Sequence, residues 1–205
     1  MTVRTILRIR SGGQTGADRA ALDAALEFGL DVAGWCPAGG WAEDFPEPPG
    51  LLVAYPQLRP TPSADPAQRT AWNVRDAHAT LVVGPFSETP SPGSDLTVAA
   101  AHVLVRPLLR AGGADPDVIL HVLDRVGLEL TLNVAGPRES EAPGTYAATL
   151  ALLRAILERD RDRDPGQREL SRGDGSAGAG TARTPPRSIL RWGRATPRPG
   201  APPAS

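Results

Sequence analysis

An apolar strand that turns on glycine into a helix is the feature that most constrains this fold. Residues 5–9, Thr-Ile-Leu-Arg-Ile, run into a turn that contains Gly12, Gly13 and Gly16, and a helix-like stretch follows over 19–27. Such a turn gathers backbone N–H groups at a helix N-terminus, where the helix dipole favours an anion. The spacing matches neither of the two familiar nucleotide-binding glycine loops. Two interpretations therefore stay open, an anion-binding turn and a turn that is merely tight.

The same strand-to-helix succession recurs along the chain. The sequence predicts strands over 5–9, 31–35, 80–84, 106–109 and 130–134, and helices over about 19–27, 65–78, 95–104, 115–127 and 145–159. Five strands alternating with five helices predict an α/β fold, a Rossmann-like doubly wound parallel sheet with helices on both faces. Ligands of such folds bind beyond the carboxyl ends of the strands, at the topological switch point.

Charge divides the 205 residues into two parts. Residues 1–158 carry 12 arginines and 18 acidic residues, whereas residues 159–205 carry 10 arginines and 5 acidic residues. The second part is rich in Arg, Pro and Gly and has few apolar residues to bury, so we expect a disordered tail. The sequence thus predicts a Rossmann-like domain over 1–158 and a tail over 159–205. A solvated appendage is the favoured interpretation of the tail, and a nucleic-acid or membrane-surface role stays open.

Several function classes are excluded by composition. All 22 basic residues are arginine, which excludes a lysine nucleophile, a Schiff base and a Walker-type phosphate lysine. Cys36 is the single cysteine, so neither an internal disulfide nor a cysteine-rich metal site is possible, and we expect a small buried residue there. We expect no protein-bound metal. No segment approaches the ~20 apolar residues of a membrane helix, and the expected location is cytoplasmic.

Polar side chains gather after the predicted strands. They are Ser11, Gln14, Thr15, Asp18 and Arg19 after the first strand, Glu43 and Asp44 after the second, 88–95 after the third, and Arg138, Glu139 and Ser140 after the last. The segments around Gly29 and over 111–115 are expected at the opposite edge. This clustering favours the binding interpretation of the first turn. Thr15 and Asp18 also fit a capping box, and the two acidic residues of the second group are either solvated or position a metal ion or water.

Seven segments in order resemble one known family. They are Ser11–Asp23, Gly34–Pro37, Ala42–Asp44, Arg69–Asp76, Ala79–Val83, Ser91–Thr97 and Leu132–Ser140, and the likeness runs from about Ile9 to Leu153. Together they resemble the molybdenum cofactor carrier family, which is similar in fold to the lysine-decarboxylase-like, or SLOG, Rossmann proteins. The resemblance implies binding of the molybdenum cofactor, molybdopterin, a pterin with a phosphate tail, without chemical change. It also implies homo-oligomers and a molybdoenzyme that accepts the cofactor.

The resemblance implies a set of binding residues and no catalytic ones. They are Ser11, Gly12, Gly13, Gln14, Thr15 and Gly16 in a first anion-binding turn, Arg69, Thr70 and Asn73 in the next segment, and Gly93, Ser94, Asp95 and Thr97 in a second turn. Many relatives place Lys and Arg where this chain has Ala38 and Gly40. The nearest arginines that could replace them are Arg69, Arg75 and Arg138, which leaves the identity of the anion open.

Three function classes remain. The favoured one is a non-catalytic carrier that binds a small phosphorylated, pterin- or nucleotide-like anion, in which a side chain added at Gly13 would stand where the anion sits and loss of Arg69 would cost little stability. The second is a phosphoribohydrolase-like hydrolase of nucleotide derivatives. Those enzymes carry a catalytic Glu after a Gly-Gly-x-Gly-Thr loop, whereas the helix after 92–97 has none, and only Asp95 could substitute. The third is a protein or nucleic-acid interaction module, supported by the basic tail alone; neither nucleic acid nor membrane is an expected partner.

Overall fold

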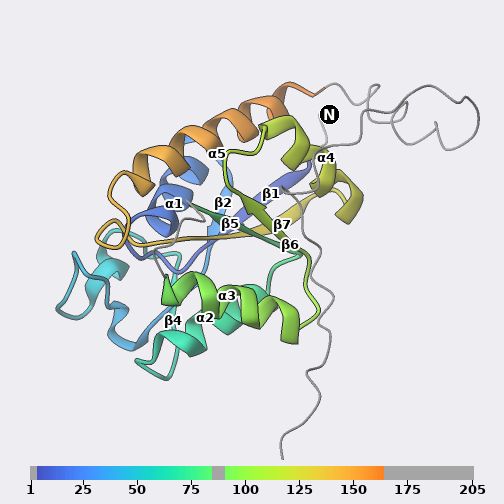
Figure 1. Ribbon diagram of the computed structural model, residues 1–205. Coiled ribbons are helices and arrows are strands. Elements are labelled where there is room, and N and C mark those ends of the chain that lie inside the picture. The colour runs from blue at the N-terminus through green and yellow to red at the C-terminus, as the bar shows by residue number, and fades with distance from the viewer. Residues whose placement is uncertain (1–3, 85–90, 164–205) are drawn as a thin grey trace, which may run out of the picture.

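Five parallel strands form one sheet in the order β2-β1-β7-β5-β6 in the computed structural model, which describes residues 4–84 and 91–163 (Figure 1). The strands of this sheet are β1 (Ile6–Arg10), β2 (Asp31–Ala33), β5 (Ala79–Val83), β6 (Leu108–Ala111) and β7 (Leu130–Ala135). The helices are α1 (Ala17–Glu27), α2 (Pro66–Arg75), α3 (Pro92–Val103), α4 (Pro116–Val126) and α5 (Thr145–Asp162). The predicted α/β class, with its parallel sheet and flanking helices, is confirmed.

The last strand in sequence lies at the centre of the sheet. β7 pairs with β1 on one side, Arg10 opposite Asn133, and with β5 on the other, Thr80 opposite Asn133. Every residue of β5 and β7 is buried. Strands covered on both faces need near-continuous apolar sequence, which is why both segments could be recognised in the sequence.

The two faces of the sheet carry different helices. α1, α4 and α5 lie on one face, and α2 and α3 lie on the other (Figure 1). The larger core fills the first interface and includes Ile9, Leu81 and Leu132. A smaller cluster, which includes Val74 of α2 and Ala101 of α3, fills the second interface. None of the helices among the described residues is long and apolar enough to cross a membrane.

Helix starts follow short polar caps placed before proline. Asp65 accepts a hydrogen bond from the Ala67 amide at 2.9 Å, and Asp115 accepts one from the Asp117 amide at 2.9 Å. Proline suits the first helical position because the N–H it lacks has no partner there. α3 also begins on this pattern, with Ser91 as the cap before Pro92, three residues earlier than predicted.

The end of α5 is tied to the beginning of β1. The buried carboxylate of Asp160 accepts hydrogen bonds from the amides of Thr5, at 2.9 Å, and Ile6, at 3.0 Å. Arg163 pairs with Asp124 on α4. The helix therefore continues past the predicted boundary at residue 158. The predicted tail lies outside the described residues from residue 164 onward.

The connection over 36–64 is packed against α1. It contains a two-stranded parallel pair, β3 (Trp35–Cys36) with β4 (Arg59–Pro60), and two 3-10 turns, Ala38–Gly40 and Gly50–Val53. Its apolar residues form a cluster of their own with Leu22, Cys36, Leu51, Tyr55 and Leu58. Cys36 is fully buried as predicted, and burial raises the pKa of its thiol.

One expected loop position was wrong. Because β6 runs parallel to its neighbour β5, the segment after Ala111 lies at the carboxyl edge of the sheet and not at the opposite edge. All strands of a parallel sheet end at the same edge. The strand before this segment was therefore predicted correctly, and only the edge at which the segment lies was wrong.

Candidate functional site

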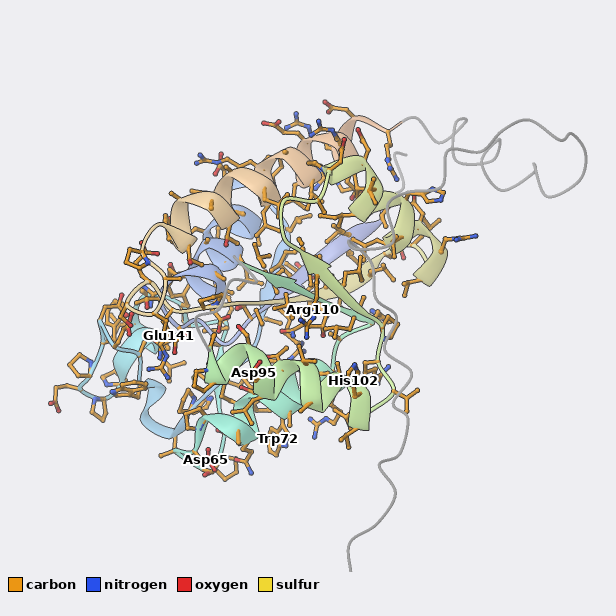
Figure 2. The ribbon with its side chains drawn as sticks, viewed as in Figure 1. Asp65, Trp72, Asp95, His102, Arg110 and Glu141 are labelled. Atoms are coloured by element: carbon orange, nitrogen blue, oxygen red, sulfur yellow. The ribbon has the colours of Figure 1, made fainter. Side chains whose placement is uncertain are left out.

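A polar cavity of about 320 Å³ lies beyond the carboxyl ends of β1 and β7. It is bordered by the starts of α1, α2 and α3 and by the loop after β7, and Figure 2 labels Asp65 and Glu141 on its border. Six residues that the sequence assigned to binding line it: Gln14, Arg69, Thr70, Gly93, Thr97 and Arg138. The two predicted anion-binding turns therefore reach one cavity.

A buried ion pair forms one wall of the cavity. Nη1 of Arg69 lies 3.0 Å from Oδ2 of Asp18, and the two side chains are 12% and 5% exposed. A Cβ atom at Gly12 would lie 1.9 Å from Arg69 Nη1, so only glycine lets the guanidinium reach the carboxylate. Nε of Arg69 is buried and, within residues 4–84 and 91–163, has no hydrogen-bond partner.

Burial dominates the electrostatics of Asp18. It raises the pKa of this carboxyl above its usual value, although the Arg69 guanidinium and the Gln14 amide both favour the ionised form. The capping-box interpretation of Asp18 was wrong, because α1 begins after Gly16 with no side-chain cap. The Thr15 hydroxyl instead donates to Glu43.

The first glycine turn is packed against other parts of the chain. A Cβ at Gly13 would lie within 3.4 Å of Leu22, Leu51 and Leu58, and its φ is +73°. A Cβ at Gly16 would lie 2.4 Å from the Pro137 carbonyl oxygen. The expectation that a side chain at Gly13 would stand where an anion sits was therefore wrong, because it would enter the apolar cluster of the 36–64 connection.

Two acidic residues that could have positioned a metal or water hold loops together instead. Glu43 accepts from the Thr15 hydroxyl and, at 2.7 Å, from the Ser140 hydroxyl. Burial opposes its ionisation, yet these hydrogen bonds keep the pKa of Glu43 below its usual value. Asp44 pairs with Arg19 at 2.8 Å. No group of three His, Cys, Asp or Glu side chains among the described residues could hold a metal ion.

The second glycine turn is open. Gly93 and Thr97 line the cavity at the N-terminus of α3, and a Cβ at Gly93 would meet nothing within 4 Å. The helix dipole favours negative charge at this end. The Thr97 hydroxyl donates to the Gly93 carbonyl at 2.9 Å. Ser94 bonds to Ser91, and the exposed Asp95 (Figure 2) does not line the cavity.

Asn73 has a structural role away from the cavity. Its Oδ1 accepts from the Trp35 amide at 2.8 Å, and its Nδ2 donates to the Trp35 carbonyl at 2.9 Å. The side chain thereby holds β3 against α2. Ser11 is likewise used structurally, because its buried hydroxyl donates to the Val134 carbonyl at 3.0 Å.

Sequence reasoning missed Glu141. Its Oε2 accepts from the Ser91 hydroxyl at 3.0 Å and from the Arg138 amide at 3.1 Å, which ties the start of α3 to the loop after β7. The signal was the position of Glu141 after the last strand, three residues beyond Arg138. Asp65, recognised only as a helix cap, also lines the cavity.

The absent basic residues have a geometric explanation at one position. Gly40 has φ +69°, and a Cβ there would lie 2.3 Å from the Pro49 carbonyl oxygen. Of the three arginines considered as replacements, Arg69 and Arg138 line the cavity. Arg75 pairs with Asp76 at the other end of α2. Arg138 also lies over the Trp41 ring, 5.5 Å from its centroid.

A larger cavity of about 580 Å³ lies at the carboxyl ends of β5 and β6. Its described lining carries no charged side chain: Val83, Gly84, Ala111, Gly112, Gly113, Thr145, Ala148, Thr149 and Leu152. By size alone this larger cavity would be the candidate ligand site. The smaller cavity is chemically better suited, because it brings together arginines, carboxylates and a helix N-terminus. Anion recognition needs those groups, so the smaller cavity is the candidate site.

The parallel sheet, with a polar cavity beyond its strand ends, defines a protein of the Rossmann-like class. The chain belongs to the circularly permutated YpsA SLOG family, whose model matches residues 9–157. It is similar to a crystal structure named "putative molybdenum carrier protein" from Syntrophus aciditrophicus, with 34% sequence identity and a TM-score of 0.65, over 76% of this chain and 97% of that chain. No curated protein matches the chain.

Proposed function

We propose that this protein is a non-catalytic carrier that binds a phosphorylated pterin of the molybdenum cofactor type in the candidate site. One observation carries the proposal: Gln14, Arg69, Thr70, Gly93, Thr97 and Arg138, taken from four separate segments, line a single cavity at the carboxyl edge of the sheet. The name of the similar Syntrophus protein supports molybdenum involvement.

The charges of the cavity favour a ligand with both an anionic group and hydrogen-bond donors. Arg69 and Arg138 are accompanied by Asp18, Asp65 and Glu141, so a simple polyanion would meet as much repulsion as attraction. A phosphate at the α3 N-terminus fits the helix dipole and the guanidinium groups. A pterin ring carries amino and ring N–H donors, which suit the carboxylates.

Transfer of the cofactor to a molybdoenzyme, and assembly of the carrier into a homo-oligomer, belong to the same proposal. Both rest on the family resemblance. A carrier must release its cofactor unchanged, so the cofactor needs a path between the site and solvent. The exposed start of α3 supports such a path.

The test is calorimetric titration with molybdenum cofactor, a pterin phosphate and AMP. We expect the cofactor and the pterin phosphate to bind, and Arg138→Ala to weaken both by about tenfold through loss of a charge-assisted contact. Arg154→Gln, which removes an exposed pair with Glu27 at 2.9 Å, is the matched control and should bind as the parent does. Absence of binding of all three ligands by the parent protein would overturn the proposal.

A hydrolase of nucleotide derivatives is the second candidate because of Asp18. A buried carboxyl with a raised pKa in a ligand cavity is suited to proton transfer. Asp95, the substitute considered from sequence, is exposed and lies outside the cavity lining. Incubation with AMP separates the two functions, because a hydrolase releases the base and ribose phosphate whereas a carrier returns AMP unchanged.

A further inference from the structure

A second group of arginines surrounds a single carboxylate at the far end of α2. Asp76 follows the last residue of α2, about 15 Å from the cavity end at Pro66 by the helix rise of 1.5 Å per residue. Oδ1 of Asp76 lies 2.6 Å from Arg75 Nε, and Oδ2 accepts from Trp35 Nε1 at 2.7 Å. Oδ2 also lies 3.7 Å from Arg10 Nη1.

The strand β1 supplies two of these arginines. Ile9 points into the main core, so its neighbours Arg8 and Arg10 point to the opposite face of the sheet. Arg8 pairs with Asp31 at 2.8 Å. Arg59 of β4 is exposed and makes no ion pair or side-chain hydrogen bond with any residue in the described parts of the chain. We call Arg8, Arg10, Arg59, Arg75 and Asp76 the Asp76 cluster.

Positive charge in this cluster exceeds what its carboxylates neutralise. Arg59 lies opposite Trp35 in the β3–β4 pair, and Trp35 in turn donates to Asp76, which Arg10 and Arg75 also face. The charges of Arg8, Arg59 and Arg75 all oppose that of Arg10, and Asp76 and Asp31 are the acidic partners of the group. The Arg10 side chain is 13% exposed, and its Nε is buried without a hydrogen-bond partner among the described residues. A largely buried guanidinium that reaches its carboxylate only at 3.7 Å is under-compensated.

A structural ion pair alone does not account for this arrangement. Asp76 is already held by Arg75 and Trp35, which fix β3 to α2. Arg10 adds a distant third contact and Arg59 adds none. Several guanidinium forks that converge with unused N–H donors are the arrangement that binds phosphate-type oxyanions.

We propose that the Asp76 cluster is a second anion site, separate from the candidate site, that takes a doubly charged tetrahedral oxyanion: a free one, or the phosphate group of a phosphomonoester. Asp76 acts there as an internal counter-ion that occupies part of the site when no anion is bound. An incoming dianion draws Arg10, Arg59 and Arg75 together and relieves the repulsion around Arg10.

Because Asp76 competes with the anion, two substitutions in the cluster should change anion affinity in opposite directions. Binding of inorganic phosphate, sulfate and glycerol phosphate to the full chain is measured calorimetrically, at ionic strength held constant with sodium chloride. Arg59→Gln should weaken the second binding event about tenfold, the factor for loss of one charge-assisted contact. Asp76→Asn should strengthen it several-fold, because the competing carboxylate is gone while the amide oxygen still accepts from Trp35.

Two controls keep the result interpretable. Arg154→Gln changes net charge equally at an exposed pair on α5 and should leave the binding unchanged. Gly93→Asp should weaken any binding at the candidate site and spare binding at the Asp76 cluster, so failure of either proposal is recognised separately. Equal binding by Arg59→Gln and the parent, or weaker binding by Asp76→Asn, would overturn the proposal. Tighter binding of phosphate and sulfate than of glycerol phosphate would identify the ligand as a free oxyanion. Tighter binding of glycerol phosphate would identify it as a phosphomonoester.

Discussion

The two glycine turns of this protein each lead into a helix, yet they differ in structure. The first, from Ser11 to Gly16, is buried: Gly12 makes room for the Asp18–Arg69 pair, and Gly13 packs against leucines of the 36–64 connection. The second, at the start of α3, is open, and a Cβ at Gly93 would meet nothing within 4 Å. Glycine in the first turn serves packing, whereas glycine in the second leaves space for a ligand.

This difference explains how one site can be both rigid and accessible. The first turn fixes Arg69 through Asp18 and so presets one wall of the cavity. The second turn provides a helix N-terminus with free volume in front of it. A glycine-to-aspartate substitution should therefore lower the stability of the fold in the first turn and impair ligand binding in the second.

The largest effect is expected for Gly13→Asp. The new carboxylate would enter a cluster of Leu22, Leu51 and Leu58 at a φ of +73°, so the free energy of unfolding should fall by about 4 kcal/mol through charge burial and backbone strain. Urea denaturation measures this. Gly29→Asp is the matched control, because Gly29 has φ +64° but no atom within 4 Å of a Cβ, and it should cost only about 1 kcal/mol. Equal losses in both variants would contradict the packing role.

Arg69→Ala should be nearly as damaging. It leaves Asp18 buried without its partner, for which a loss of about 3 kcal/mol in unfolding free energy is expected. This reverses the sequence-based expectation that Arg69 is exposed and dispensable for stability. Arg154→Ala, which breaks a pair with about half of each side chain exposed, should change stability by less than about 0.5 kcal/mol. Thermal and urea unfolding of both variants test the contrast.

Gly93→Asp should spare the fold and impair binding. An acidic residue in the first turn of a helix is favourable, so stability should stay within about 0.5 kcal/mol of the parent. The carboxylate would occupy the space in front of α3 and repel an anion, weakening pterin phosphate binding at least about tenfold. A Gly93→Asp variant that binds like the parent would remove the second turn from the site.

The smallest effect concerns pH. The pKa of Asp18 is raised in the folded protein, so the folded state takes up this proton more readily than the unfolded state, and the Asp18 contribution to stability improves as pH falls through that pKa. Protonation also frees Arg69 from its partner. Sulfate affinity, measured in the Arg59→Gln background to weaken binding at the Asp76 cluster, should then rise about threefold as pH falls from neutrality. Asp18→Asn should show the higher affinity already at neutral pH and no such dependence.

The sequence predicted the sheet because its strands carry their own signals. The segments at 80–84 and 130–134 are apolar runs long enough to be read as buried strands. β3 and β4 have two residues each, too few to show a period. They depend on pairing with each other across the long connection, which no local pattern reveals.

The site was predicted in outline and not in its contacts. Arg69 and Gly93 could be assigned because they lie in segments that resemble the molybdenum cofactor carrier family. The partner of Arg69 is 51 residues away in sequence, and the partner of Asn73 is 38 residues away. Asn73 in a helix indicates that its side chain has a special role, but only the fold shows that the role is to bind the backbone of Trp35.

The central place of β7 has a consequence for the order of assembly during synthesis. β1, β2, β5 and β6 leave the ribosome first, yet β1 and β5 meet only through β7. Until residues 130–135 emerge, the growing chain holds two separate strand pairs with unpaired inner edges, the state in which nascent sheets are prone to mispair. The loop that carries Arg138 emerges directly afterwards, so the candidate site is complete only once the centre of the sheet has been made.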